Sequence, residues 1–107
     1  MKELVNIKLD KTRHIFFGLR AQKMTEKMLG IKSFLGYMNT TKGEIGANEM
    51  STILYAGLLW EDNDITLDSV IDLVDEHSNI ITVIEAIGKA IQIAMSNDKE
   101  EKPEKNV

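Results

Sequence analysis

The chain has 107 residues, which is enough for one domain with a single hydrophobic core and too few for two. Hydrophobic residues make up 43% and charged residues 28%, a balance that excludes wholesale disorder. The net charge of −4 lacks the basic excess of a nucleic-acid binder, and the absence of cysteine excludes disulfides and thiolate chemistry. The first residues are polar where a signal peptide needs an apolar run, so a cytoplasmic protein is expected.

Alternating apolar and polar residues predict a β-hairpin over residues 3–17. Two short β-prone runs, residues 4–9 and 12–17, flank the polar pair Asp10 and Lys11. The pair lacks the glycine that a tight two-residue turn prefers. The hairpin is predicted nevertheless, because this alternation is confined to the first part of the chain.

The segment after the hairpin changes to helical spacing. Four apolar residues fall at that spacing: Leu19, Met24, Met28 and Leu29. Gly30 suits a left-handed C-cap, so a helix is predicted over about residues 20–29. Residues 31–46 are expected to be mainly loop, with a further short helical turn near Phe34 left open because Gly36 weakens it.

The second half of the chain predicts three helices, at about residues 47–60, 67–76 and 79–95. In the first of them, Gly57 costs about 1 kcal/mol relative to alanine, so it indicates a close neighbouring backbone. Thr66 is a suitable N-cap for the second helix and Ser78 for the third. The buried side of the second helix is predicted to comprise Val70, Ile71, Leu73 and Val74.

Together these patterns predict an α+β fold that is mostly α, with the N-terminal β-hairpin packed on a bundle of about four helices. The domain is expected to span residues 1–96. Residues 97–107 are predicted to form a disordered charged tail, whose deletion should leave the melting temperature nearly unchanged. The longest apolar stretch is shorter than the roughly 20 residues that cross a bilayer, so no membrane association is expected.

Residue types that carry chemistry do not form a recognisable site. His14 and His77 stand far apart without a second ligand at metal-binding spacing, so no metal is expected. Four oxygen donors alternate as in a calcium loop, at Asp62, Asp64, Thr66 and Asp68. Leu67 and Leu73 occupy the positions where that loop needs glycine and a bidentate glutamate. The glycines match no phosphate-binding pattern and no nucleophile motif is present, so neither an enzyme nor a cofactor is expected.

Candidate protein-interface residues are Trp60, Ile81 and Ile93. Trp60 is the only tryptophan and stands beside charged residues, so either core packing or an interface anchor is possible. The last helix has more apolar surface than a one-sided core needs, and either the hairpin covers the excess or another chain does. Ile84 and Ile87 are assigned to its buried stripe, so replacing either with Glu should unfold the domain.

Two parts of the chain match the sequence pattern of a known protein family. In the second half, the matching residues are Ala56, Gly57, Leu58, Trp60, Glu61, Asp62, Thr66, Leu67, Val70, Asp72, Leu73 and Asp75. In the first part they are Val5, Ile7, Leu9, Asp10, Arg13, Ile15, Phe16, Glu26, Met28, Leu29, Gly30 and Ile31. In both parts the chain resembles the tail assembly chaperones of long-tailed bacteriophages. It departs from their usual pattern in residues 31–46, where the loop is unusually polar.

This resemblance implies a non-enzymatic viral chaperone that acts in the cytoplasm of the bacterial host. Such proteins bind the tape measure protein, help to recruit subunits of the major tail tube protein and are absent from the mature virion. The resemblance and the surplus apolar surface together predict a homo-oligomer. Neither nucleic acid nor membrane is an expected partner.

The rival interpretation is a small regulatory domain of a phage or mobile element, with a helix-turn-helix that binds DNA or protein. Residues 54–74 have the required helical arrangement. The second helix, however, carries Asp68, Asp72, Asp75 and Glu76 without a lysine or arginine, and it would repel a phosphate backbone. Retention on a heparin or DNA column distinguishes the two interpretations.

Overall fold

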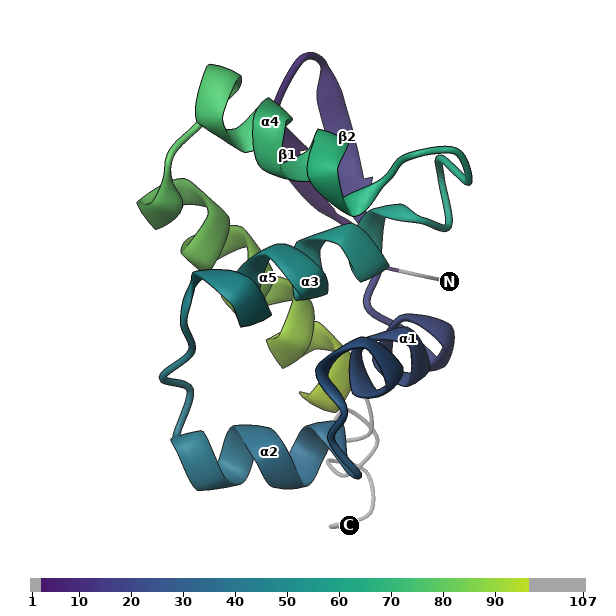
Figure 1. Ribbon diagram of the computed structural model, residues 1–107, viewed down its shortest axis with the longest axis vertical. Helices are drawn as coiled ribbons and strands as arrows, with labels where there is room; N and C mark the ends of the chain where they lie inside the picture. The colour runs from purple at the N-terminus through teal and green to yellow at the C-terminus, as the bar shows by residue number, and fades with distance from the viewer. Residues whose placement is uncertain (1–2, 97–107) are drawn as a thin grey trace, which may run out of the picture.

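A computed structural model describes residues 3–96 of the chain (Figure 1). Its elements, in order, are β1 (Val5–Lys8), β2 (Thr12–Ile15), α1 (Leu19–Leu29), α2 (Phe34–Thr41), α3 (Ala47–Leu58), α4 (Leu67–His77) and α5 (Ile80–Ser96). The predicted fold class, α+β and mostly α with an N-terminal hairpin, is confirmed. The tail predicted for residues 97–107 lies outside the described residues.

The two strands form an antiparallel hairpin that buries one face. Val5 lies opposite Ile15 and Ile7 opposite Arg13, and the aliphatic members of these pairs are buried. The turn is made without glycine. Arg13 binds the Asp10 carboxylate through Nε and Nη2, at 2.9 and 3.1 Å, so a charged pair on the strand end stabilises the turn.

Helix α3 lies at the centre of the fold and contacts α1, α4, α5 and β2. Gly57 is where the hairpin crosses this helix. The Phe16 backbone N–H donates to the Gly57 carbonyl at 3.0 Å, and a Cβ on Gly57 would lie 2.7 Å from Cγ2 of Ile15. The close neighbouring backbone that Gly57 indicated is therefore confirmed.

Residues 39–41 were expected to be loop, and this prediction is wrong, because they continue helix α2, which begins at Phe34. The Ser33 hydroxyl caps it by accepting from the Gly36 N–H at 3.0 Å. Phe34 is buried, and its ring lies 5.0 Å from that of Phe17. The helix therefore forms because a cap and one buried aromatic residue outweigh the weak helix propensity of its glycine, asparagine and threonines.

Two predicted helix faces are rotated from their expected positions. In α1 the buried residues are Ala21 and Thr25, while Leu19 and Met28 are exposed. In α5 they are Val83, Ala86, Ile87, Ala90 and Ile91. Ile84, which was assigned to the core, is 45% exposed, so that assignment is wrong. The reason is that α3 and the hairpin cover an arc of α5 adjoining the one with the largest side chains.

The caps at α4 and α5 follow from local hydrogen bonds. Thr66 caps α4 as predicted, because its hydroxyl accepts from the Ser69 N–H at 3.1 Å. Helix α5 is capped by Asn79 in place of Ser78, since the Asn79 carboxamide oxygen accepts from the Thr82 N–H at 2.9 Å. On α4, Val70 is buried and Leu73 and Val74 are partly buried, but Ile71, predicted to be buried, is exposed.

Candidate binding surface

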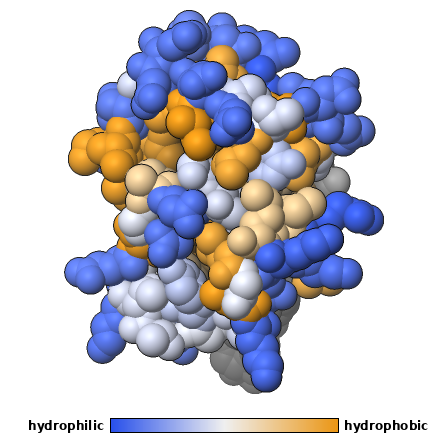
Figure 2. Space-filling view, in the orientation of Figure 1, coloured by the Kyte–Doolittle hydropathy of each residue, from blue (hydrophilic) through white to orange (hydrophobic). Residues whose placement is uncertain are grey.

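Large apolar side chains are exposed where α5 begins. Ile80 is 51% exposed, Ile81 61% and Ile84 45%. Figure 2 shows apolar surface gathered over this end of α5, at the left edge of the view, below the hydrophilic surface of α4. An isolated exposed apolar residue needs no explanation, but a contiguous group on a rigid helix is typical of an interaction surface.

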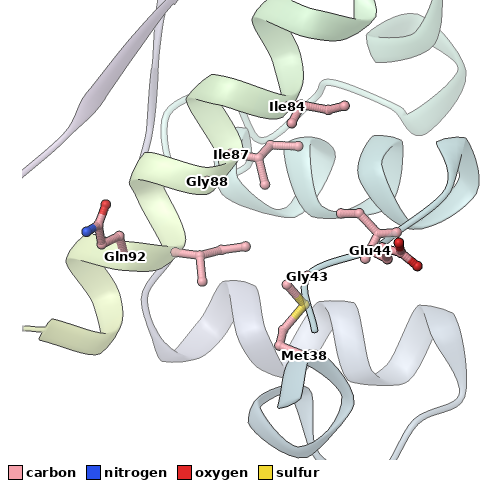
Figure 3. Close-up of a pocket in the computed structure, with 9 residues that line it drawn as sticks. Met38, Gly43, Glu44, Ile84, Ile87, Gly88 and Gln92 are labelled. Atoms are coloured by element: carbon pink, nitrogen blue, oxygen red, sulfur yellow. The ribbon is translucent and has the colours of Figure 1, made fainter. Parts of the chain in front are cut away.

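A groove of about 780 Å³ lies between α2 and α5, and we call it the α2–α5 groove. Its lining residues are Met38, Gly43, Glu44, Ile45, Ile84, Ile87, Gly88, Ile91 and Gln92. Figure 3 shows Ile84 and Ile87 projecting from α5 toward the α2–α3 connection, with Met38 facing them from α2. A Cβ on Gly88 would meet nothing within 4 Å, so the helix backbone itself is accessible in this groove.

A second groove, of about 400 Å³, lies on the other side of the exposed isoleucines, and we call it the α4–α5 groove. Its apolar lining residues are Ala47, Met50, Leu54, Ile71, Val74, Ile80 and Val83, drawn from α3, α4 and α5. Asp75 lines it as well. Together, the two grooves and the isoleucines between them form an apolar surface along α5.

The charged residues around the α4–α5 groove are acidic. Between Lys42 and Lys89 the sequence contains neither lysine nor arginine. The acidic residues of that stretch are Glu44, Glu49, Glu61, Asp62, Asp64, Asp68, Asp72, Asp75, Glu76 and Glu85. The α4–α5 groove belongs entirely to this acidic stretch, whereas most basic residues lie in the hairpin, α1 and the segment up to α2.

Trp60, the first predicted interface residue, packs on the hairpin and also remains partly exposed. Its indole Nε1–H donates to the His14 carbonyl at 2.9 Å, and its ring meets that of Phe16 edge-on with centroids 6.3 Å apart. The side chain is still 43% exposed. Trp60 thus stabilises the contact between β2 and the end of α3 while leaving part of an aromatic face at the surface.

Carboxylates after α3 complete this contact with the hairpin. Glu61 accepts from the His14 backbone N–H at 3.0 Å, and its other oxygen lies 2.7 Å from Nδ1 of the same residue. Burial acts to raise the pKa of Glu61, but the hydrogen bonds from His14 and the nearby Arg13 charge outweigh it and lower the pKa below its ordinary value. Arg13 is buried and also donates to Asp62 at 3.2 Å, which joins the hairpin turn to the α3–α4 loop.

The other two predicted interface residues lie in different surroundings. Ile81 is the most exposed residue of the α5 group, whereas Ile93 is only partly exposed and packs against the core. Trp60 lines a separate hollow with Phe16 and Arg20, so the predicted residues do not form one site. Sequence reasoning missed Ile71, Ile80 and Ile84, although the unbroken acidic stretch around them was visible in the sequence.

Among residues 3–96, no group of three His, Asp or Glu side chains is placed to hold a metal ion. None of the described helices combines the length and apolar character needed to cross a membrane. No protein-family model matches the chain, and searches of curated proteins and of solved structures gave no match. Function is therefore inferred from the chain's own surface and from its resemblance to the tail assembly chaperones.

Proposed function

We propose that this chain is a non-enzymatic tail assembly chaperone of a long-tailed bacteriophage, which binds the tape measure protein and assists assembly of the tail tube. The observation that carries the proposal is the exposed isoleucine surface at the start of α5, bounded by two open apolar grooves. The tape measure protein is proposed as the partner because the hairpin and the α3–α4 segment resemble that family.

The shape of this surface suits a chaperone. A tape measure protein is long and helical, so its chaperone must cover apolar stripes on an extended partner and later release them. Open grooves lined by isoleucines provide non-directional, repeated contacts of this kind. The same proposal includes self-association of the chaperone along its partner, the bacterial cytoplasm as its location and its absence from the finished virion.

Co-expression with the tape measure protein tests the proposal. We expect the wild-type chain to keep the tape measure protein soluble and to co-purify with it. A double variant, Ile81→Glu with Ile84→Glu, should lose both effects because it places two charges on the apolar surface. The control is Leu35→Glu on α2, which places one charge at an equally apolar side chain that is 53% exposed outside both grooves.

The control variant should behave as the wild type does. A tape measure protein that is equally soluble without the chain, and that never co-purifies with it, would contradict the proposed function.

A further inference from the structure

The α4–α5 groove has features that specify the chemistry of a ligand. Its floor is formed by Leu54 and Val83, which are buried, and its walls carry Ile71 on α4 and Ile80 on α5, which are exposed. The walls are separate helices, so the groove is a trough between elements that side chains of a partner helix can enter. Apolar helices dock in such troughs through residues spaced i, i+3 or i+4, and i+7.

The α4 wall is acidic on its outer side. Asp68 precedes Ile71 by three residues and Asp75 follows it by four, so both lie on the same helix face as Ile71. Asp72 and Glu76 are exposed beside them. No described lysine or arginine belongs to α3, α4 or the loop between them. The basic group that these elements do offer is His77, whose Nε2 lies 3.6 Å from the Glu76 carboxylate at the end of α4.

We propose that the α4–α5 groove binds an amphipathic helix whose apolar stripe is flanked by lysine or arginine. The apolar stripe would cover Ile71 and Ile80, and the basic flank would pair with Asp68, Asp72 and Asp75. Charge complementarity fixes the orientation of the helix and favours its binding over that of an acidic helix. The inference rests on the proposed function only for the identity of the protein that carries this helix.

A second copy of the chain is a weaker candidate for the same groove. Its most basic helix is α1, which carries Arg20, Lys23 and Lys27. The exposed large apolar residues of α1 are Leu19 and Met28. These two are nine residues apart and therefore point to opposite sides of the helix, so α1 does not present an apolar stripe.

Two synthetic peptides of about 18 residues, or five helical turns, test the inference. Both carry leucine at the i, i+4, i+7 and i+11 positions; one has lysine beside this stripe and the other glutamate. Fluorescence anisotropy with the full chain should show at least about tenfold tighter binding of the lysine peptide, a difference of about 1.4 kcal/mol. This preference should shrink in high salt.

Variants then locate the binding site. The double variant Ile71→Ser with Ile80→Ser should weaken binding of the lysine peptide about tenfold or more, while Leu35→Ser leaves it unchanged. Replacing Asp68 and Asp75 with Asn should reduce the preference for the lysine peptide. The mutated side chains are all exposed, and unchanged melting temperatures would show that the fold is intact.

Three results would overturn the inference. The first is equal affinity for the two peptides. The second is binding of the lysine peptide that the Ile71→Ser, Ile80→Ser variant retains. The third is a wild-type oligomer that this variant loses, since it would assign the groove to a second copy. Co-purification of the tape measure protein is a separate readout, so the proposed function can fail while the peptide still binds.

Discussion

Two glycines on neighbouring helices show how the environment of a single residue decides the effect of one methyl group. A Cβ on Gly88 would meet nothing within 4 Å, whereas a Cβ on Gly57 would overlap Ile15. We expect Gly88→Ala to stabilise the fold by about 0.5 to 1 kcal/mol, because alanine has the higher helix propensity. Gly57→Ala should destabilise it by about 1 to 3 kcal/mol through overpacking. Urea denaturation of both variants measures the difference, and a shift of the same sign in both would contradict the structure.

Because the pKa of Glu61 is lowered in the folded chain, we expect the fold to lose stability in acid. The pKa of this carboxylate is lower in the folded chain than its ordinary value, so its stabilising effect is present above about pH 4.3, its usual unfolded pKa, and is lost as the pH falls through the folded value. The wild type should therefore exceed Glu61→Gln in stability at about pH 6, and the gap should narrow toward about pH 3. Thermal melts of both proteins across this range measure it. A gap that is constant with pH would show that the carboxylate charge does not stabilise the hairpin contact.

Some single residues were predictable from the sequence and others were not. Gly57 and Thr66 were predictable because residue type alone indicates their roles: a glycine inside a helix suggests a close neighbouring backbone, and a threonine before a helix suggests a cap. Arg13 is different, since its partners include Asp62, which is brought near only by the fold. The same holds for Trp60, whose hydrogen bond to His14 joins segments that are far apart in the sequence.

At the scale of elements, α5 has isoleucines on both its buried and its exposed face. Both Ile84 and Ile87 line the α2–α5 groove, but Ile87 is buried and Ile84, one turn earlier, is exposed. Ile87→Glu should cost several kcal/mol or unfold the domain, because an unpaired charge would enter the core. Ile84→Glu should cost less than about 1 kcal/mol, as is usual at the surface. Circular dichroism melts compare the two. Equal and large losses would place Ile84 in the core after all.

The same helix explains the limits of the sequence prediction. Periodicity located α1, α3, α4 and α5 to within a few residues, because each has apolar residues at helical spacing. Periodicity did not show which face of α5 is turned toward the core. Isoleucine, valine and alanine cover so much of the helix circumference that several faces are equally apolar. The covered arc is set by α3 and the hairpin. Helix α2 was underestimated for a related reason, because its stability depends on Phe34 packing against a distant residue, Phe17.

At the scale of the whole molecule, the chain separates its charges. The hairpin, α1 and the segment up to Lys42 carry most of the lysines and arginines, while α3 and α4 have none. The net charge of −4 therefore conceals an uneven distribution. Helix packing does not require this separation, since many of the carboxylates on α4 are exposed. It is accounted for if the acidic part of the surface selects a basic partner by electrostatic steering.

Self-association is the last prediction, and it belongs to the proposed function. Copies bound side by side on an extended partner gain from contact with one another, so the free chain should oligomerise as its concentration rises. Ile81 is the most exposed residue of the α5 surface and is absent from the linings of both grooves, so we expect it to lie in that contact. Ile81→Glu should shift sedimentation toward the monomer without lowering the melting temperature.

Leu35→Glu is the control for this experiment. It adds the same charge on α2, at a leucine that is 53% exposed and lies outside both grooves, and it should leave the oligomer intact. If both variants disperse the oligomer equally, net charge controls association and Ile81 has no special part in it. A wild-type chain that remains monomeric at high concentration would remove self-association from the proposed function. The peptide-binding inference would be unaffected, because it depends on Ile71 and Ile80 in the α4–α5 groove.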